Sequence, residues 1–520
     1  MVEPCPYCLS RSRDVRYTVL FLLQSVITLT VSFKTGNNYN VNSASPNEAQ
    51  WIPIPDGVRW GNCLNLGAAM GLFLSCMFQW VLMNTRLGSF LAKRSLHAAV
   101  ALEIILSVGI LAFSRVHWPL AVVLGVMAVN GVRWGTRLKD SRHFLGMLVD
   151  MVVEVLGEVR GAAGVPILIL LLQVMYLIWW GRALSSSLTG TSMSSGWGGS
   201  VLVLMLFNLY WTCQVFRGIM VVFVSGTMSS CCTSDNRKSK GSGFSQELVE
   251  GKGYLDEYDE YLNDDVLVGE GGRDGGDTDG NPLVSGRNES HDSVSGSGRP
   301  KERGSSRENT LVENTLVAVY LRIALTSSFG SACKGAILSP LGQLRSMVTC
   351  LTSRVREPSG RQISRGGRCV DAFESLTRGY HDLALVHVGA YSTAYSPAVD
   401  EVWKLLRQSG LEAVFAEDLV GPAMNWLSVS MAVLTAAAIG AAPHGHAADR
   451  LIFFTFLVFY VVRSCMQTGT EVLRSAVYAV YLQFVDNPHS LGERFSLIYH
   501  RLERVSELWK YQDQLWGVQV

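Results

Sequence analysis

The chain has 520 residues, of which 48% are apolar and 17% are charged, and its mean hydropathy is +0.22. A soluble domain carries about 25% charged residues. The composition therefore excludes an ordinary soluble enzyme, a collagen-like fibre and a small disulfide-stapled protein. The net charge of +1 shows no nucleic-acid footprint at the level of the whole chain. We predict an all-α, polytopic integral membrane protein with no nucleic-acid partner.

A helix needs about 20 apolar residues to cross the hydrocarbon core of a bilayer. The sequence has ten apolar runs near this length, so we expect about ten transmembrane helices. Arginines before the first run predict a cytosolic N-terminus at residues 1–16. The expected spans are Tyr17–Phe33, Cys63–Met83, Leu96–Phe113, Trp118–Val132, Pro166–Leu184 and Ser200–Val224 within residues 17–232, then Leu316–Leu338, 380–406, Val420–Ala441 and Leu451–Thr470 within residues 314–486.

Residues near 140–160 have a different pattern. Apolar side chains recur there at three- and four-residue spacing, as at Leu148, Val152 and Val155, while Asp150 and Glu154 lie on the other side. This pattern is typical of an amphipathic helix. We expect it to lie on the cytosolic membrane interface between the fourth and fifth spans.

Residues 233–313 are rich in Gly, Ser, Asp and Glu and hold 18 acidic against 10 basic residues. Such a segment buries too little apolar area to offset the entropy lost on ordering. We predict a disordered, acidic, cytosolic linker there, and a second cytosolic segment at 487–520. Arginines crowd residues 339–378, which ten spans would place outside. Either the positive-inside bias is overridden there, or a neighbouring helix is re-entrant.

One aromatic stripe lies within the sixth predicted span. Phe207, Tyr210, Trp211 and Gln214 share one side of a helix by their spacing. Aromatic faces can hold a quaternary ammonium, which has no proton to donate, at about 0.5–2 kcal/mol per ring. The stripe is therefore a candidate cation cage. The alternative is that these rings pack against lipid or core.

Glu103 lies well inside the third predicted span. A bare carboxylate at the bilayer centre costs at least about 2.5–3.5 kcal/mol, so this one should face a cavity or a partner. It could be a counter-charge for a transported cation or an exchanged proton. It could equally form a structural pair with Arg463, Arg322 or Lys334. No Walker box, H-E-x-x-H or G-x-S-x-G motif appears, so we expect neither an enzyme nor a cofactor or metal.

Four segments, in order, resemble the choline transporter-like family. The third contains Phe329-Gly330-Ser331, which is the most specific box, and this segment matches the second half of the family's "HLGSLAFGSLILA". In the fourth, Tyr478 stands where the family has an aspartate. The four segments are Arg13–Val15 with Leu20–Leu23, Leu206–Thr212 continuing to Val224–Thr227, Ser328–Ser331 with Gly335–Leu338, and Val477–Asn487.

The resemblance implies a multi-pass carrier of the plasma membrane that transports choline or a related organic amine. Its driving force would be the membrane potential or a proton gradient. Phe329, Gly330, Ser331 and Tyr478 join the stripe and Glu103 as candidate substrate-binding residues, with the Phe-Gly-Ser turn a point of close packing or helix breakage. The alternative is an interaction protein that keeps this fold and binds basic partners through its acidic linker.

Overall fold

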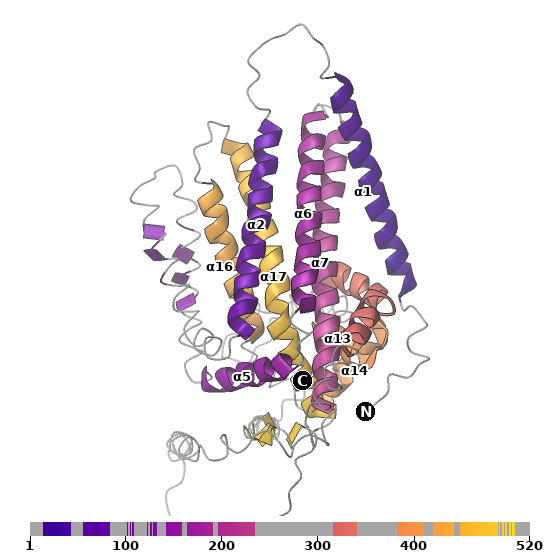
Figure 1. Cartoon of the computed structure of the whole chain (residues 1–520), viewed down its shortest axis with the longest axis vertical. Helices are drawn as coiled ribbons and strands as arrows, with labels where there is room; N and C mark the ends of the chain where they lie inside the picture. Colours follow the sequence, from indigo (N-terminus) through magenta and orange to yellow (C-terminus); the bar gives the residue numbers. More distant parts are fainter. Residues whose placement is uncertain are drawn as a thin grey trace, which may run out of the picture. The chain divides into compact units, whose positions relative to one another are not determined.

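The computed structural model describes the helical part of the chain (Figure 1). Compact unit 1 comprises residues 1–235 and 313–520, and residues 236–312 form a second unit that lies wholly outside the described residues. The described residues are 14–42, 56–83, 142–158, 164–190, 196–233, 316–340, 382–409, 420–440 and 448–486, with scattered positions at 101–132 and 488–504.

Every regular element in these ranges is a helix, which agrees with the predicted all-α class. The expected spans Leu96–Phe113 and Trp118–Val132 fall mostly outside the described residues. So do Glu103, the acidic linker, the basic segment 339–378 and most of the tail. The helices are α1 (Val15–Asn42), α2 (Asp56–Met83), α5 (Arg142–Glu158), α6 (Gly164–Gly190), α7 (Gly196–Thr233), α13 (Asp382–Tyr391), α14 (Tyr395–Ser409), α16 (Val420–Gly440) and α17 (Ala448–Asp486).

Three described stretches are long and apolar enough to cross a membrane: Gly61–Met83, Gly164–Ser185 and Gly199–Cys232. A fourth candidate consists of Leu316–Leu325 and Phe329–Pro340, which bend by 59° at a short break and are called the bent pair below. Each of the four coincides with a predicted span. The chain is thus a multi-pass membrane protein, and the total of ten spans stays a prediction.

The outer faces of these helices suit a lipid solvent. On α2 the exposed large side chains are Leu66, Met70, Phe73, Met77 and Trp80, which recur every three or four residues. The opposite face of the same helix is buried. In water such a stripe would be costly to expose, whereas in a bilayer it meets hydrocarbon as apolar as itself.

α17 packs against α16, α2 and α7. Small residues let α2 approach it closely. A Cβ added at Gly71 would lie 3.0 Å from the Cβ of Cys465, and one added at Gly469 would lie 3.0 Å from the Cβ of Ser75. Helices associate in this way in membranes, because lipid provides no hydrophobic driving force between them and close packing at small residues stabilises the contact instead.

The predicted amphipathic helix is α5, which lies crosswise to α2 and α17 (Figure 1). Its apolar side chains from Leu148 to Leu156 are buried in the same core as the second half of α7 and the end of α17. The face expected to meet the membrane interface therefore packs at least partly against protein.

Two predicted helices are interrupted. The single helix expected over 380–406 is wrong, because residues 392–394 separate α13 from α14 and Ser392 has a φ of 52°. α13 has 10 residues, about 15 Å of helix, which is half the thickness of the hydrocarbon core. The span expected at Leu316–Leu338 is likewise not one continuous helix but the bent pair.

Candidate functional site

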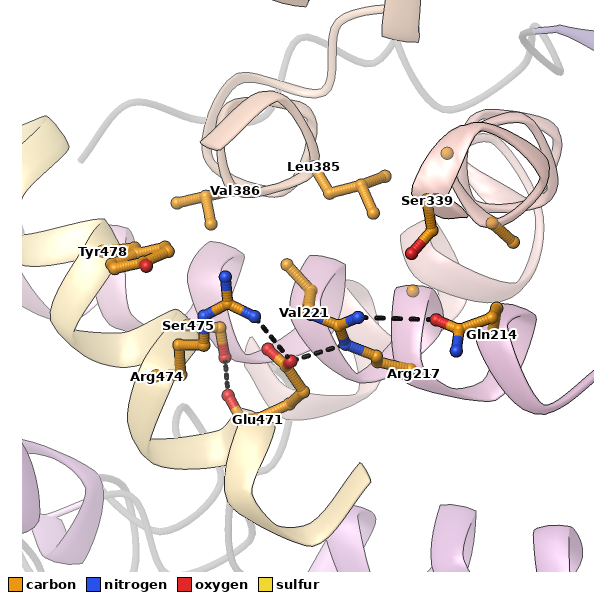
Figure 2. Close-up of a pocket in the computed structure, with 13 residues that line it drawn as sticks. Gln214, Arg217, Val221, Ser339, Leu385, Val386, Glu471, Arg474, Ser475 and Tyr478 are labelled. Atoms are coloured by element: carbon orange, nitrogen blue, oxygen red, sulfur yellow. Dashed lines mark hydrogen bonds and ion pairs between the residues drawn. The ribbon is translucent and has the colours of Figure 1, made fainter. Parts of the chain in front are cut away.

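A pocket of about 400 Å³, its open mouth included, lies among α7, α17, α13 and the second half of the bent pair. Figure 2 shows its polar side chains converging from α7 and α17, with Leu385 and Val386 of α13 opposite them. Small residues open the space. The described lining consists of Gln214, Arg217, Gly218, Val221, Gly335, Ala336, Ser339, Leu385, Val386, Glu471, Arg474, Ser475 and Tyr478.

Three charged side chains form the polar floor of the pocket. Arg217 Nε lies 2.5 Å from Glu471 Oε1, and Arg474 Nη1 donates to the same oxygen at 3.1 Å. All three side chains are 16% exposed or less. Burial makes each charge expensive on its own, so the carboxylate that both guanidinium groups share offsets part of their desolvation cost. Arg217 Nη1 also donates to Gln214 Oε1 at 3.4 Å.

The pocket contains a cation–π contact between Arg474 and Tyr478. The Arg474 guanidinium lies 5.1 Å from the ring centroid of Tyr478, one turn further along α17. A cation within about 6 Å of a ring face is attracted by its quadrupole. The pocket therefore contains a carboxylate and an aromatic ring, the two groups that recognise an organic ammonium, and both are engaged by Arg474.

The bent pair breaks at a run of hydroxyl residues, Thr326 to Ser328. Thr326 Oγ1 donates to the Arg322 carbonyl at 2.6 Å, and Ser327 Oγ donates to the Ile323 carbonyl at 3.3 Å. Such bonds often bend a helix, while the Thr326 amide keeps its own bond to the Arg322 carbonyl at 2.9 Å. The Ser328 amide reaches back five residues to the Ile323 carbonyl, and regular bonding resumes at Ala332. Phe329 thus begins the second helix, whose residues Gly335 to Ser339 reach the pocket.

The predicted aromatic stripe stays together on α7, with the Phe207 and Trp211 ring centroids 5.6 Å apart, but its members differ in burial. Phe207 is 43% exposed, whereas Trp211 is 3% exposed. The Trp211 indole donates to the Cys333 carbonyl at 3.1 Å, and its ring packs edge-on against Phe21 at 5.5 Å. Gln214 and Tyr478 line the pocket, while Phe207, Tyr210 and Trp211 are not among the residues that line it.

The Phe-Gly-Ser turn meets the N-terminal Arg-Asp-Val segment. Ser331 is fully buried, and its hydroxyl donates to Asp14 Oδ2 at 2.9 Å. Gly330 is buried beside it, and Phe329 packs against Phe21 with ring centroids 5.8 Å apart. Two segments that carry the family resemblance, 317 residues apart, are thus in direct contact.

Two of the possible partners of Glu103 have other contacts in the described part of the chain. Lys334 pairs with Asp14 at 3.6 Å, and Arg463 Nη2 donates to Asn425 Oδ1 at 3.3 Å. Arg322 is exposed. Within the described residues, no group of three or more His, Cys, Asp or Glu side chains is placed to hold a metal ion.

Sequence reasoning missed Arg217, Glu471 and Arg474 as a site. The signal was present, since each is a charged residue within or next to an apolar run, and Glu471 and Arg474 are three residues apart on one helix. The cost of a membrane-embedded charge, applied to Glu103, applies equally to these residues. The pairing of Arg217 with Glu471 was out of reach, because they are 254 residues apart.

The sequence of this chain is similar to those of known membrane proteins. A family model described as plasma-membrane choline transporter matches residues 121–489, which include the whole described lining of the pocket. A CTL-like protein of Dictyostelium discoideum is 21% identical over 217 residues, 42% of this chain and 40% of that protein. The protein PNS1 of Eremothecium gossypii is 29% identical over 125 residues, 22% of each chain, and that of Saccharomyces cerevisiae is 24% identical over 199 residues, 34% of this chain and 36% of the other.

The matched stretches thus span two fifths or less of these relatives' own length. The family model, in contrast, covers most of this chain, from the fourth predicted span to the end of α17. The apolar helices and the break in the bent pair agree with a membrane carrier. The chain belongs to the plasma-membrane choline transporter family, a family of membrane transporters.

Proposed function

We propose that the chain transports choline or a related organic amine across the plasma membrane, through the pocket between α7, α17, α13 and the bent pair. One observation carries this proposal: a discontinuous helix meets a buried ionic cluster at a pocket. In secondary transporters, broken helices commonly form the substrate site near the middle of the membrane. The pocket's described lining lies entirely within the stretch that matches the family.

Glu471 and Tyr478 are the groups that would hold the amine. Among the described residues that line the pocket, Glu471 is the one acid and Tyr478 the one aromatic residue. Both contact Arg474 in this conformation. An arriving ammonium would replace the guanidinium of Arg474 at the carboxylate and at the ring face. Arg217 would stay paired with Glu471, so the carboxylate would be neutralised whether the pocket is filled or empty.

This exchange explains how a pocket with two guanidinium groups can admit a cation. A further positive charge beside both arginines would be repelled, so entry requires Arg474 to move outward. The membrane potential supplies about 2.3 kcal/mol per charge per 100 mV, which is enough to accumulate a monovalent cation without a chemical energy source. A coupled proton is the other way to drive uptake.

The decisive experiment is uptake of radiolabelled choline by a choline-dependent yeast strain that expresses the chain. Tyr478→Leu removes the ring face and should raise the KM several-fold, corresponding to about 0.5–2 kcal/mol. Tyr478→Phe keeps the face and should be close to wild type. Glu471→Gln should abolish uptake, whereas Glu503→Gln, near the end of the chain, should not. No uptake of any organic amine by the wild type, with the protein present in the membrane, would refute the proposal.

A further inference from the structure

A lysine ammonium is held in a second cluster, at the start of α1. Lys334 lies on the second half of the bent pair, and its Nζ is 5.4 Å from the ring centroid of Tyr17 and 5.7 Å from that of Tyr395. The same nitrogen is 3.6 Å from Asp14 Oδ1 and donates to the hydroxyl of Ser396. The cluster of Asp14, Tyr17 and Tyr395 is called the tyrosine cage below.

The Asp14 carboxylate of the cage is held in place by hydrogen bonds that do not involve Lys334. Asp14 Oδ2 accepts from the Ser331 hydroxyl at 2.9 Å and from the Tyr395 amide at 3.0 Å. Asp14 also has a φ of 55°, a left-handed conformation that is uncommon for a residue other than glycine. Two hydrogen bonds from two other segments therefore orient this carboxylate, and its other oxygen, Oδ1, lies 3.6 Å from the ammonium.

Two tyrosine faces and one carboxylate are the groups that proteins use to bind organic ammonium ions. An ordinary lysine ion pair needs only the carboxylate. The Lys334 and Asp14 side chains are 14% and 15% exposed, so the cage is neither sealed nor fully open. It also adjoins the pocket: a Cβ added at Gly335, which lines the pocket, would lie 3.1 Å from the ring of Tyr395.

We propose that the tyrosine cage is a second binding site for organic ammonium ions and that the Lys334 ammonium is its tethered occupant, which an incoming amine displaces. Lys334 has the length and charge to fill the cage from within the chain, so in the wild type it competes with external amines. The proposal deepens the proposed function. It can be tested without transport, so the two can fail separately.

The test measures the binding of tetramethylammonium to the purified full-length protein in detergent. The readout is the melting temperature of the protein at increasing tetramethylammonium concentration. A ligand that binds only the folded state raises that temperature in a saturable way. Lys334→Ala empties the cage, so both tyrosine rings and the Asp14 carboxylate become available to the added amine. The apparent Kd of this variant for tetramethylammonium should therefore be about tenfold lower than that of the wild type. Lys334→Arg keeps a tethered cation and should behave as the wild type does. Sodium chloride at equal ionic strength is the salt control.

The carboxylate provides the second comparison. Lys334→Ala combined with Asp14→Asn should lose the gained affinity, because the rings remain but the counter-charge is gone. Equal affinity of Lys334→Ala and the wild type, or of the single and double variants, would overturn the proposal. If Lys334→Ala is recovered only as aggregate, tetramethylammonium in the growth medium should restore the folded protein. Failure of that rescue would also count against the cage.

Discussion

Replacing Gly389 with alanine should force α13 away from α7. The added Cβ would overlap the Ser225 hydroxyl and would lie 2.5 Å from the carbonyl oxygen of Val222. The hydroxyl could rotate, but at the loss of its hydrogen bond to the Val221 carbonyl, 2.7 Å long. The Val222 carbonyl belongs to the helix backbone and cannot move alone. Overpacking of this kind costs about 1–3 kcal/mol.

The assay is thermal melting of the purified protein in detergent, paired with choline uptake. At about 2–4 °C per kcal/mol, the scale for domains of about 150–250 residues, Gly389→Ala should melt roughly 2–12 °C below the wild type. Uptake should also fall, because Leu385 and Val386 on the displaced helix line the pocket.

The matched control is Gly199→Ala on α7, where an added Cβ meets nothing within 4 Å. It should leave the melting temperature unchanged or raise it slightly, since alanine favours the helix by about 0.5–1 kcal/mol over glycine. The close approach of α13 and α7 would be refuted if Gly389→Ala melted within about 1 °C of the wild type, half the smallest expected shift.

Three further predictions concern the site and the linker. Glu471→Leu should destabilise the protein by about 3–5 kcal/mol, because it leaves Arg217 and Arg474 without the carboxylate they share. Adding Arg217→Leu to this variant should recover part of the lost melting temperature. Trp211→Leu should lower the melting temperature, because the lost hydrogen bond to the Cys333 carbonyl costs about 1–3 kcal/mol. The KM for choline should stay as in the wild type. A raised KM at an unchanged melting temperature would instead place the indole at the substrate. Replacing residues 236–312 by a short Gly-Ser linker should preserve both melting temperature and uptake, since unit 1 has its own core; loss of uptake with the bundle intact would favour the linker as the working part.

The sequence alone was enough to predict a membrane protein that is helical throughout its described residues, and to locate three apolar spans and the bent pair. The length of an apolar run is a local property, and the bilayer imposes the same length on every helix that crosses it. The family followed from short segments such as Phe329-Gly330-Ser331, whose order along the chain is also visible without a structure. The residue types of the break could be seen as well, since Thr326, Ser327 and Ser328 stand in a row.

Only the tertiary structure decided which of these residues meet. The aromatic stripe was read correctly as one side of a helix, but the direction of that side depends on neighbouring helices, and Trp211 turned out to be buried against Phe21 and the bent pair. The contacts of Arg217 with Glu471 and of Asp14 with Ser331 join residues more than 250 positions apart. Helix packing brings such pairs together, and the periodicity of a single helix holds no information about its partner on another.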